Sequence, residues 1–87
     1  MKIVAVCGSG LGSSFLIEMN INETCKALKI DAEVSHINLG SFDPNATDVV
    51  VCGADLEDSI EFQEKIVLQN IVDKDETFEK IKKYFNK

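Results

Sequence analysis

A glycine-rich turn between an apolar run and an amphipathic segment constrains the fold of this chain more than any other feature. Residues 3–7 form a short, β-branched apolar run that ends at a glycine, which is typical of a buried strand. Residues 8–14 contain three alternating glycines and three serines. A helix is expected directly afterwards, with Ser13 or Ser14 as its N-cap. The pattern therefore predicts a strand, a tight turn and a helix, in that order.

The rest of the chain alternates between strand and helix patterns. Further strands are expected over residues 31–38, 48–53 and 65–70, and further helices over residues 55–61 and 75–85. The polarity of residues 31–38 indicates an edge position in the sheet. Residues around Pro44 are expected to form a loop.

Two of the expected helices have an apolar face. In the first helix, apolar residues at helical spacing are Phe15, Ile17, Met19, Ile21, Cys25 and Leu28. In the last helix, the apolar residues are Phe78, Ile81 and Phe85, with Lys80, Lys82 and Lys83 towards its negative end. Both helices are therefore expected to pack on a sheet.

This alternation predicts an α/β fold with a parallel sheet and helices on both faces. Right-handed crossovers favour the strand order 2-1-3-4 in a single three-layer, Rossmann-like domain over residues 1–87. In that order the chain reverses direction between the first and third strands. Ligands of such sheets bind at the carboxyl ends of the strands, at this switch point. Cys7 is expected to lie there.

The charge balance excludes several classes of function. The net charge is −6, from 15 acidic residues against 9 basic ones, and every basic residue is a lysine. An acidic chain without arginine is a poor candidate for nucleic-acid binding. Any phosphate site must rely on backbone amides, hydroxyls and a helix end, because no guanidinium is available.

The cysteine and histidine content argues against a metal site. The three cysteines stand at positions 7, 25 and 52, and His36 is the only histidine. These wide spacings do not match a zinc site, so neither a metal nor another cofactor is expected. No apolar run is long enough to cross a bilayer, and the first residues lack a signal-peptide cleavage pattern. We therefore expect a cytoplasmic protein with reduced thiols.

The turn CGSGLGSS has the composition of an anion site. Its glycines allow successive N–H groups to point inward, and the following helix adds free amides and a positive dipole end. Cys7 stands at its entrance, where a helix N-terminus lowers a thiol pKa from about 8.5 towards neutrality. We predict that Cys7 is a nucleophilic thiolate that accepts a phosphoryl group. The predicted phosphate-binding residues are Gly8, Ser9, Gly10, Leu11, Gly12, Ser13 and Ser14.

Other glycine-rich sites fit this turn less well. The third glycine comes too early for a dinucleotide fingerprint, and no lysine follows Gly12 as a nucleotide P-loop requires. A small tyrosine phosphatase would carry an arginine where Ser13 stands. A tight turn with a buried, inert Cys7 remains the structural alternative.

Residues 6–14, followed by Met19 and Ile21, resemble the enzyme IIB component of the bacterial sugar phosphotransferase system. The ascorbate-type branch is the most similar, and the lactose/cellobiose, galactitol and mannitol types are relatives. The resemblance implies a four-stranded parallel sheet and a phosphotransferase. In that family, the cysteine takes a phosphoryl group from a phosphohistidine of the IIA protein and passes it to a sugar bound by the membrane protein IIC. Carried onto this chain, Cys7 is the phosphorylated residue and residues 8–14 form the phosphate loop.

Several other residues near the expected switch point have two interpretations. Cys52 ends the third strand, so a thiol redox or anion-binding module that uses Cys7 and Cys52 is the alternative function, although a small buried hydrophobe explains Cys52 as well. His36 is either a general base or an ordinary surface or half-buried histidine. Asp55, Glu57 and Asp58 form either a docking rim or a solvated helix start.

Leu11 and Phe15 are candidates for a partner-docking surface. If the turn amides point inward, then Leu11 points outward and leaves an apolar side chain beside the reactive cysteine. Such a residue suits the docking of a IIA partner. Phe15 either joins that surface or belongs to the core.

Overall fold

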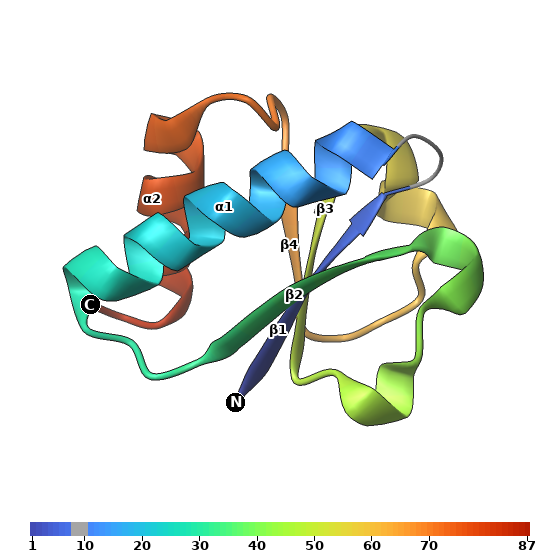
Figure 1. Ribbon diagram of the computed structural model, residues 1–87, viewed down its shortest axis with the longest axis horizontal. Helices are drawn as coiled ribbons and strands as arrows, with labels where there is room; N and C mark the ends of the chain where they lie inside the picture. Colours follow the sequence, from blue (N-terminus) through green and yellow to red (C-terminus); the bar gives the residue numbers. More distant parts are fainter. Residues whose placement is uncertain (8–10) are drawn as a thin grey trace.

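The computed structural model describes the backbone of residues 1–7 and 11–87, and the side chains of residues 1–6 and 15–87. The described backbone forms one four-stranded sheet with α-helices on one side and 3₁₀ helices on the other (Figure 1). The elements, in chain order, are β1 (Lys2–Cys7), α1 (Leu11–Leu28), β2 (Glu33–Asn38), the 3₁₀ helices η1 (Leu39–Ser41) and η2 (Pro44–Ala46), β3 (Val49–Gly53), the 3₁₀ helix η3 (Ala54–Ser59), β4 (Lys65–Leu68) and α2 (Lys74–Tyr84).

All three strand pairs are parallel, and the strand order is β2-β1-β3-β4, which confirms the predicted order 2-1-3-4. The two central strands, β1 and β3, are the most apolar, and every residue of β3 is buried. The polar strand β2 lies at one edge, as expected, because only an inner strand must be apolar on both faces.

Both α-helices pack on the same face of the sheet. Ile3 and Ala5 of β1 point into this layer, where they meet the buried side of α1 and Ile81 of α2. The fully buried residues of this cluster are joined by half-buried neighbours at its rim, among them Val34 and Phe85. This larger of the two apolar clusters therefore lies between the sheet and the two α-helices.

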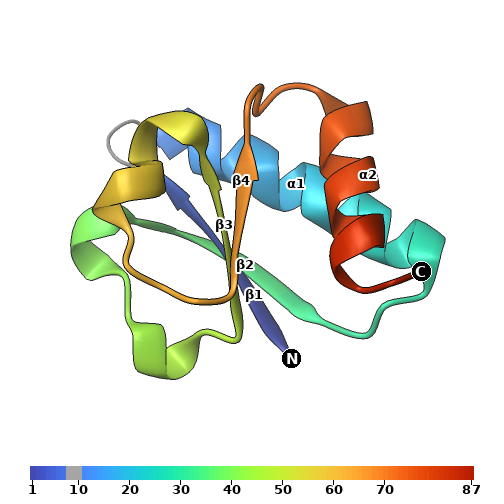
Figure 2. The same cartoon turned by 180° about the vertical axis from the view of Figure 1, so that it is seen from behind.

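The opposite face is covered by η1, η2, η3 and their connections, which lie across the sheet from the α-helices in both views (Figures 1 and 2). Val4 and Val6 alternate with Ile3 and Ala5 and therefore point into this second cluster. Phe42 and Phe62 cover it with an edge-to-face contact at 5.7 Å between ring centroids. Helices thus cover both faces, as predicted, and the short helix expected over residues 55–61 is η3.

The start of α1 differs from the prediction. The helix begins at Leu11, so Ser13 and Ser14 lie in its first turn and neither is the N-cap. The physical reason is that serine is tolerated inside the first turn as well as before it, so two adjacent serines do not define the boundary.

Phe15 and Met19, on the outer side of α1, do not widen the buried apolar face as expected; for Phe15 the surface interpretation holds and the core interpretation does not. Their side chains are 57% and 39% exposed, whereas Asn20 and Thr24 are buried. The side-chain oxygen and nitrogen of Asn20 have no hydrogen-bond partner among the described residues. The buried side of α1 therefore does not coincide with its most apolar side. The helix packs against α2 as well as against the sheet, and this changes which residues are buried.

Glu76 connects the start of α2 to the end of β4. Its carboxylate accepts hydrogen bonds from the backbone N–H groups of Gln69 at 2.6 Å and Asn70 at 2.8 Å, and it pairs with Lys80 at 2.8 Å. Burial alone would raise the pKa of Glu76, but the hydrogen bonds from Lys80 and the two amides outweigh burial and lower it. The ionised carboxylate therefore stabilises the folded state.

We predict that Glu76→Gln lowers the free energy of unfolding by about 2 kcal/mol at pH 7, because charge-assisted hydrogen bonds are lost. The folded-state pKa lies below the ordinary value of 4.5, so this contribution is present above that pH and disappears as pH falls through the folded-state pKa. Urea unfolding at pH 7 and at acid pH measures it. Glu79→Gln, an exposed change on the same helix, is the control. A difference between Glu76→Gln and wild type that stayed constant with pH would contradict the prediction.

Candidate functional site

Cys7 ends β1 at the carboxyl edge of the sheet. It pairs in register with Asn38, the last residue of β2, while its neighbour Val6 pairs with Cys52 of β3. From β1 the chain passes through α1 to β2, which lies next to β1 on one side. The later strand β3 lies next to β1 on its other side. Cys7 therefore stands at the switch point, where parallel α/β sheets bind ligands.

The helix that follows Cys7 begins only four positions later, at Leu11. The backbone of Leu11, Gly12, Ser13 and Ser14 forms its first turn, where amide N–H groups have no carbonyl partner inside the helix. Gly8, Ser9 and Gly10, the rest of the predicted phosphate loop, lie outside the described residues. The described part thus brings the end of β1 and a helix amino end to one place, as an anion site requires.

The end of β3, beside Cys7, is closely packed around Gly53. A Cβ atom at this position would lie 2.7 Å from Oδ1 of Asp55 and 3.2 Å from Cγ2 of Ile71. A larger residue at this position would require the Asp55 carboxylate to move away from the end of the strand. The switch point is consequently bounded on its β3 side by backbone and by a carboxylate.

The predicted rim residues Asp55, Glu57 and Asp58 all lie in η3 and are exposed. They make the sheet edge beside β3 acidic, which lowers the local concentration of free anions. The amine of Lys65 donates to the carbonyl oxygens of Glu57 at 2.6 Å and Ile60 at 3.0 Å. This lysine therefore holds η3 against the sheet.

His36 lies on β2 and contacts α1. Its Nδ1 atom is paired with Oε2 of Glu18, and its ring meets Phe15 edge-on at 5.8 Å between centroids, with 72° between the ring planes. The imidazole is 40% exposed, which agrees with the surface or half-buried interpretation. Sequence analysis missed this pair, because residues 18 positions apart carry no local signal of contact.

Cys52 is completely buried in the cluster that contains Val6 and Val50. Burial raises the pKa of the Cys52 thiol; Lys65 lowers it in part, and Glu57 and Asp55 raise it further. Burial also raises the pKa of the Cys25 thiol in the core beneath α1. Both are free thiols that stay protonated at neutral pH. This environment favours the interpretation of Cys52 as a small buried hydrophobe over a redox partner.

We predict that iodoacetamide at pH 7 modifies one cysteine of the native protein, Cys7, because the other two thiols are buried and protonated. Peptide mass spectrometry locates the adduct. In Cys7→Ser the native protein should stay unmodified, and unfolding in urea should expose Cys25 and Cys52 to the reagent. Rapid native labelling of Cys52, or a Cys7–Cys52 disulfide after mild oxidation, would contradict this prediction.

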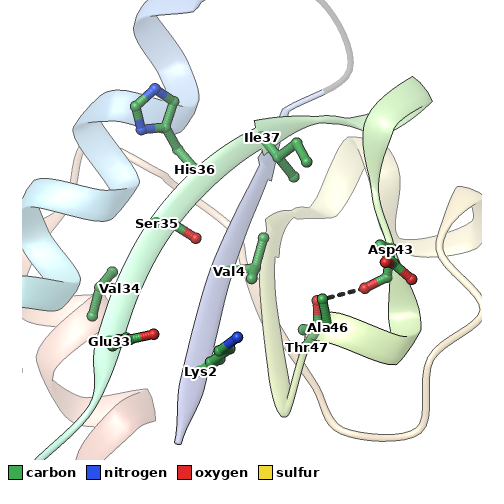
Figure 3. Close-up of a pocket in the computed structure, with 10 residues that line it drawn as sticks. All are labelled: Lys2, Val4, Glu33, Val34, Ser35, His36, Ile37, Asp43, Ala46 and Thr47. Carbon is green, nitrogen blue, oxygen red and sulfur yellow. Dashed lines mark hydrogen bonds between the residues drawn. The ribbon is translucent and has the colours of Figure 1, made fainter.

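A groove of about 470 Å³ lies beside β2 on the sheet face opposite α1 (Figure 3). The apolar residues Val4 and Ile37 form its floor. Lys2, the first residue of β1, also lines it. Figure 3 shows the ring of His36 turned out of the groove, towards α1. The groove runs along β2 from Glu33 to Ile37 and beside Lys2 and Val4 of β1.

Metal-ligand clusters and membrane-spanning helices are both absent from the part of the chain that the structure describes. No three or more His, Cys, Asp or Glu side chains among these residues converge to hold a metal ion. Neither α1 nor α2, the described α-helices, combines the length and the apolar character that crossing a bilayer demands.

One protein-family model matches residues 2–83 of this chain, and it is described as the lactose/cellobiose-specific IIB subunit of the PTS system. The match includes all four strands, the whole of α1 and all but the last residue of α2. No individual curated protein matches the chain. The match extends over far more than half of the chain, so it assigns the family for the domain as a whole.

Proposed function

Because this chain belongs to the lactose/cellobiose-type IIB family of the sugar phosphotransferase system, we propose that Cys7 is the residue that carries the phosphoryl group. A IIB component is a phosphoryl-relay protein of sugar uptake. The observation that carries the proposal is the position of Cys7: it ends β1 at the switch point, opposite Asn38 and just before the amino end of α1. Anionic groups bind at such helix ends.

The transfer needs a thiolate and a set of donors for phosphoryl oxygens. The Cys7 thiolate attacks the phosphorus of a phosphohistidine on the IIA partner, so a P–S bond forms as the P–N bond breaks and the imidazole leaves. In the second step a sugar hydroxyl bound by IIC attacks phosphorus, its proton is released, and the thiolate leaves. Residues 8–14 would supply backbone amides and serine hydroxyls to the phosphoryl oxygens in both steps.

The electrostatic setting suits a carrier better than a hydrolase. The chain has no arginine, and the side chain of Lys65 is occupied by carbonyl oxygens of η3. Without a guanidinium clamp, the site should hold the phosphoryl group moderately and release it in either direction. The acidic rim of Asp55, Glu57 and Asp58 should discourage free anions from competing for the site.

We further propose an ascorbate-like carbohydrate as the substrate, since residues 6–14 most resemble the ascorbate-type branch. In this proposal a IIA protein donates the phosphoryl group and the membrane transporter IIC binds the sugar. The reaction then takes place at the cytoplasmic side of the membrane. The rival function, a thiol redox module, needs an accessible second thiol, whereas Cys52 is completely buried.

We predict that the wild-type protein becomes phosphorylated on Cys7 when it is incubated with phosphoenolpyruvate, the general phosphotransfer proteins and IIA. Cys7→Ser should abolish the label, because a serine hydroxyl is not ionised at neutral pH. Cys52→Ala is the matched control and should keep the label, since Cys52 lies within the apolar cluster. Peptide mass spectrometry and the stability profile of a thiophosphate ester identify the site. Label that persists in Cys7→Ser would refute the proposal.

The IIA donor is proposed to dock on the amino half of α1. Phe15 and Met19 are exposed there and line a groove of about 320 Å³, beginning one turn after Leu11. Exposed apolar side chains beside a reactive group are typical of a protein-docking surface.

We predict that Leu11→Asp raises the KM for the phosphorylated IIA donor about tenfold, the effect of losing roughly 1.4 kcal/mol of docking energy. Ala27→Asp places the same charge at an exposed position near the far end of α1 and should leave KM unchanged. Rapid-quench measurement of transfer at several donor concentrations gives both parameters. Equal KM values for Leu11→Asp and wild type would remove Leu11 from the docking surface.

A further inference from the structure

The contact between His36 and Glu18 ties the edge strand to the helix that follows Cys7. His36 pairs in register with Ala5, two positions before the pair formed by Cys7 and Asn38. Its Nδ1 atom meets Oε2 of Glu18, in the second turn of α1. A carboxylate can only accept a hydrogen bond, so Nδ1 of the imidazole carries the hydrogen that is donated.

This contact lies in the amino half of α1. Among the described side chains of α1, which begin at Phe15, Phe15 is mostly exposed and Ile17 is the first that is fully buried. The Phe15 ring rests edge-on against the His36 ring at 5.8 Å, so the histidine supports two residues of the second turn.

Three elements, β1, β2 and α1, are each connected to the other two around this contact. β2 is held to β1 by the parallel ladder up to Cys7, and α1 follows β1 after only three intervening residues. A link from β2 back to α1 therefore fixes the amino end of α1 relative to Cys7. A shift of the helix end would move its free amides away from the phosphoryl group.

We propose that His36 is a positioning residue for phosphoryl transfer: by donating to Glu18 it holds the first turn of α1, with its free amides, in place at Cys7. The inference rests on the proposed function of Cys7. His36 itself does not touch the phosphoryl group. Because both side chains are partly exposed, the pair should contribute little to global stability, and its effect should appear in the chemistry of Cys7.

The first test follows the alkylation of Cys7 as a function of pH, which needs no partner protein. Ala and Asn replacements of His36 both remove the imidazole, but the Asn side chain keeps an N–H donor near the position of Nδ1. We expect His36→Ala to slow alkylation at pH 7 about threefold and to shift its midpoint upward, since helix-end amides stabilise the thiolate. His36→Asn should behave like wild type.

Glu18 offers the same comparison from the other side of the contact. Glu18→Ala should reproduce the effect of His36→Ala, and Glu18→Gln, which keeps an acceptor oxygen, should restore most of the wild-type profile. The double variant His36→Ala/Glu18→Ala should be no slower than either single variant, because one interaction is removed in all three. Additive effects would overturn the proposal.

The second test measures phosphoryl transfer from IIA. His36→Ala should lower the rate at saturating donor about fivefold, the upper range for a partly exposed ion pair. Any loss of support for the docking residue Phe15 would appear in KM instead. Lys74→Ala is the matched control, since it breaks another exposed ion pair of α1, that of Glu23 with Lys74 at 3.5 Å, from a residue of α2 that lies outside the docking groove. It should leave the transfer rate unchanged.

The two tests distinguish a failure of the positioning role of His36 from a failure of the proposed function of Cys7. Wild-type rates and alkylation profiles in His36→Ala, an effect on KM alone, or failure of His36→Asn to restore the profile would overturn the positioning role. An unlabelled Cys7 in the wild-type protein would overturn the proposed function and, with it, the role of His36 in transfer.

Discussion

The parallel pairing of β1 with β3 is the interaction on which the rest of this structure depends. Val4, Val6 and Val50 are buried on one face of these central strands, and Ile3 and Val51 on the other. Because both strands are apolar on both faces, they occupy the middle of the sheet, and the polar strand β2 is left at the edge. This order alone brings Cys7 to the switch point and allows α1 to begin beside it.

Features that follow from local pattern were predictable from the sequence, and features that depend on distant contacts were not. The β-branched runs of β1 and β3 and the alternation of strands and helices predicted the sheet order correctly. The buried side of α1 was predicted only in part, because Asn20 is buried and Phe15 is exposed in a helix that packs against α2 as well as the sheet. The pairing of His36 with Glu18 also could not be predicted from the sequence, because only the folded chain brings the two residues together. For the site itself, the sequence predicted the place of Cys7, while the roles of residues 8–14 stay a prediction.

The charge distribution is compatible with the proposed phosphoryl site, although the chain has no arginine. A helix amino end and backbone amides provide a partial positive charge that needs no basic side chain. Acidic side chains of η3 beside the same edge of the sheet oppose the entry of free anions, so the proposed function would have a docked protein deliver the phosphoryl group. The exposed apolar side chains of Phe15 and Met19 on α1 would be the docking surface in this proposal. Membership of a IIB family accords with such a protein-to-protein relay.

The most direct test of the central claim is the phosphorus-31 NMR spectrum of the protein after phosphorylation through IIA. A phosphoryl group on the Cys7 thiolate predicts one protein resonance in the region of S-phosphates, absent when Cys7 is alkylated beforehand. His36 is the only histidine of the chain, so a P–N bond within this protein has only that imidazole as its side-chain site. A resonance in the phosphohistidine region that belongs to this chain, or a S-phosphate resonance that survives alkylation of Cys7, would contradict the account.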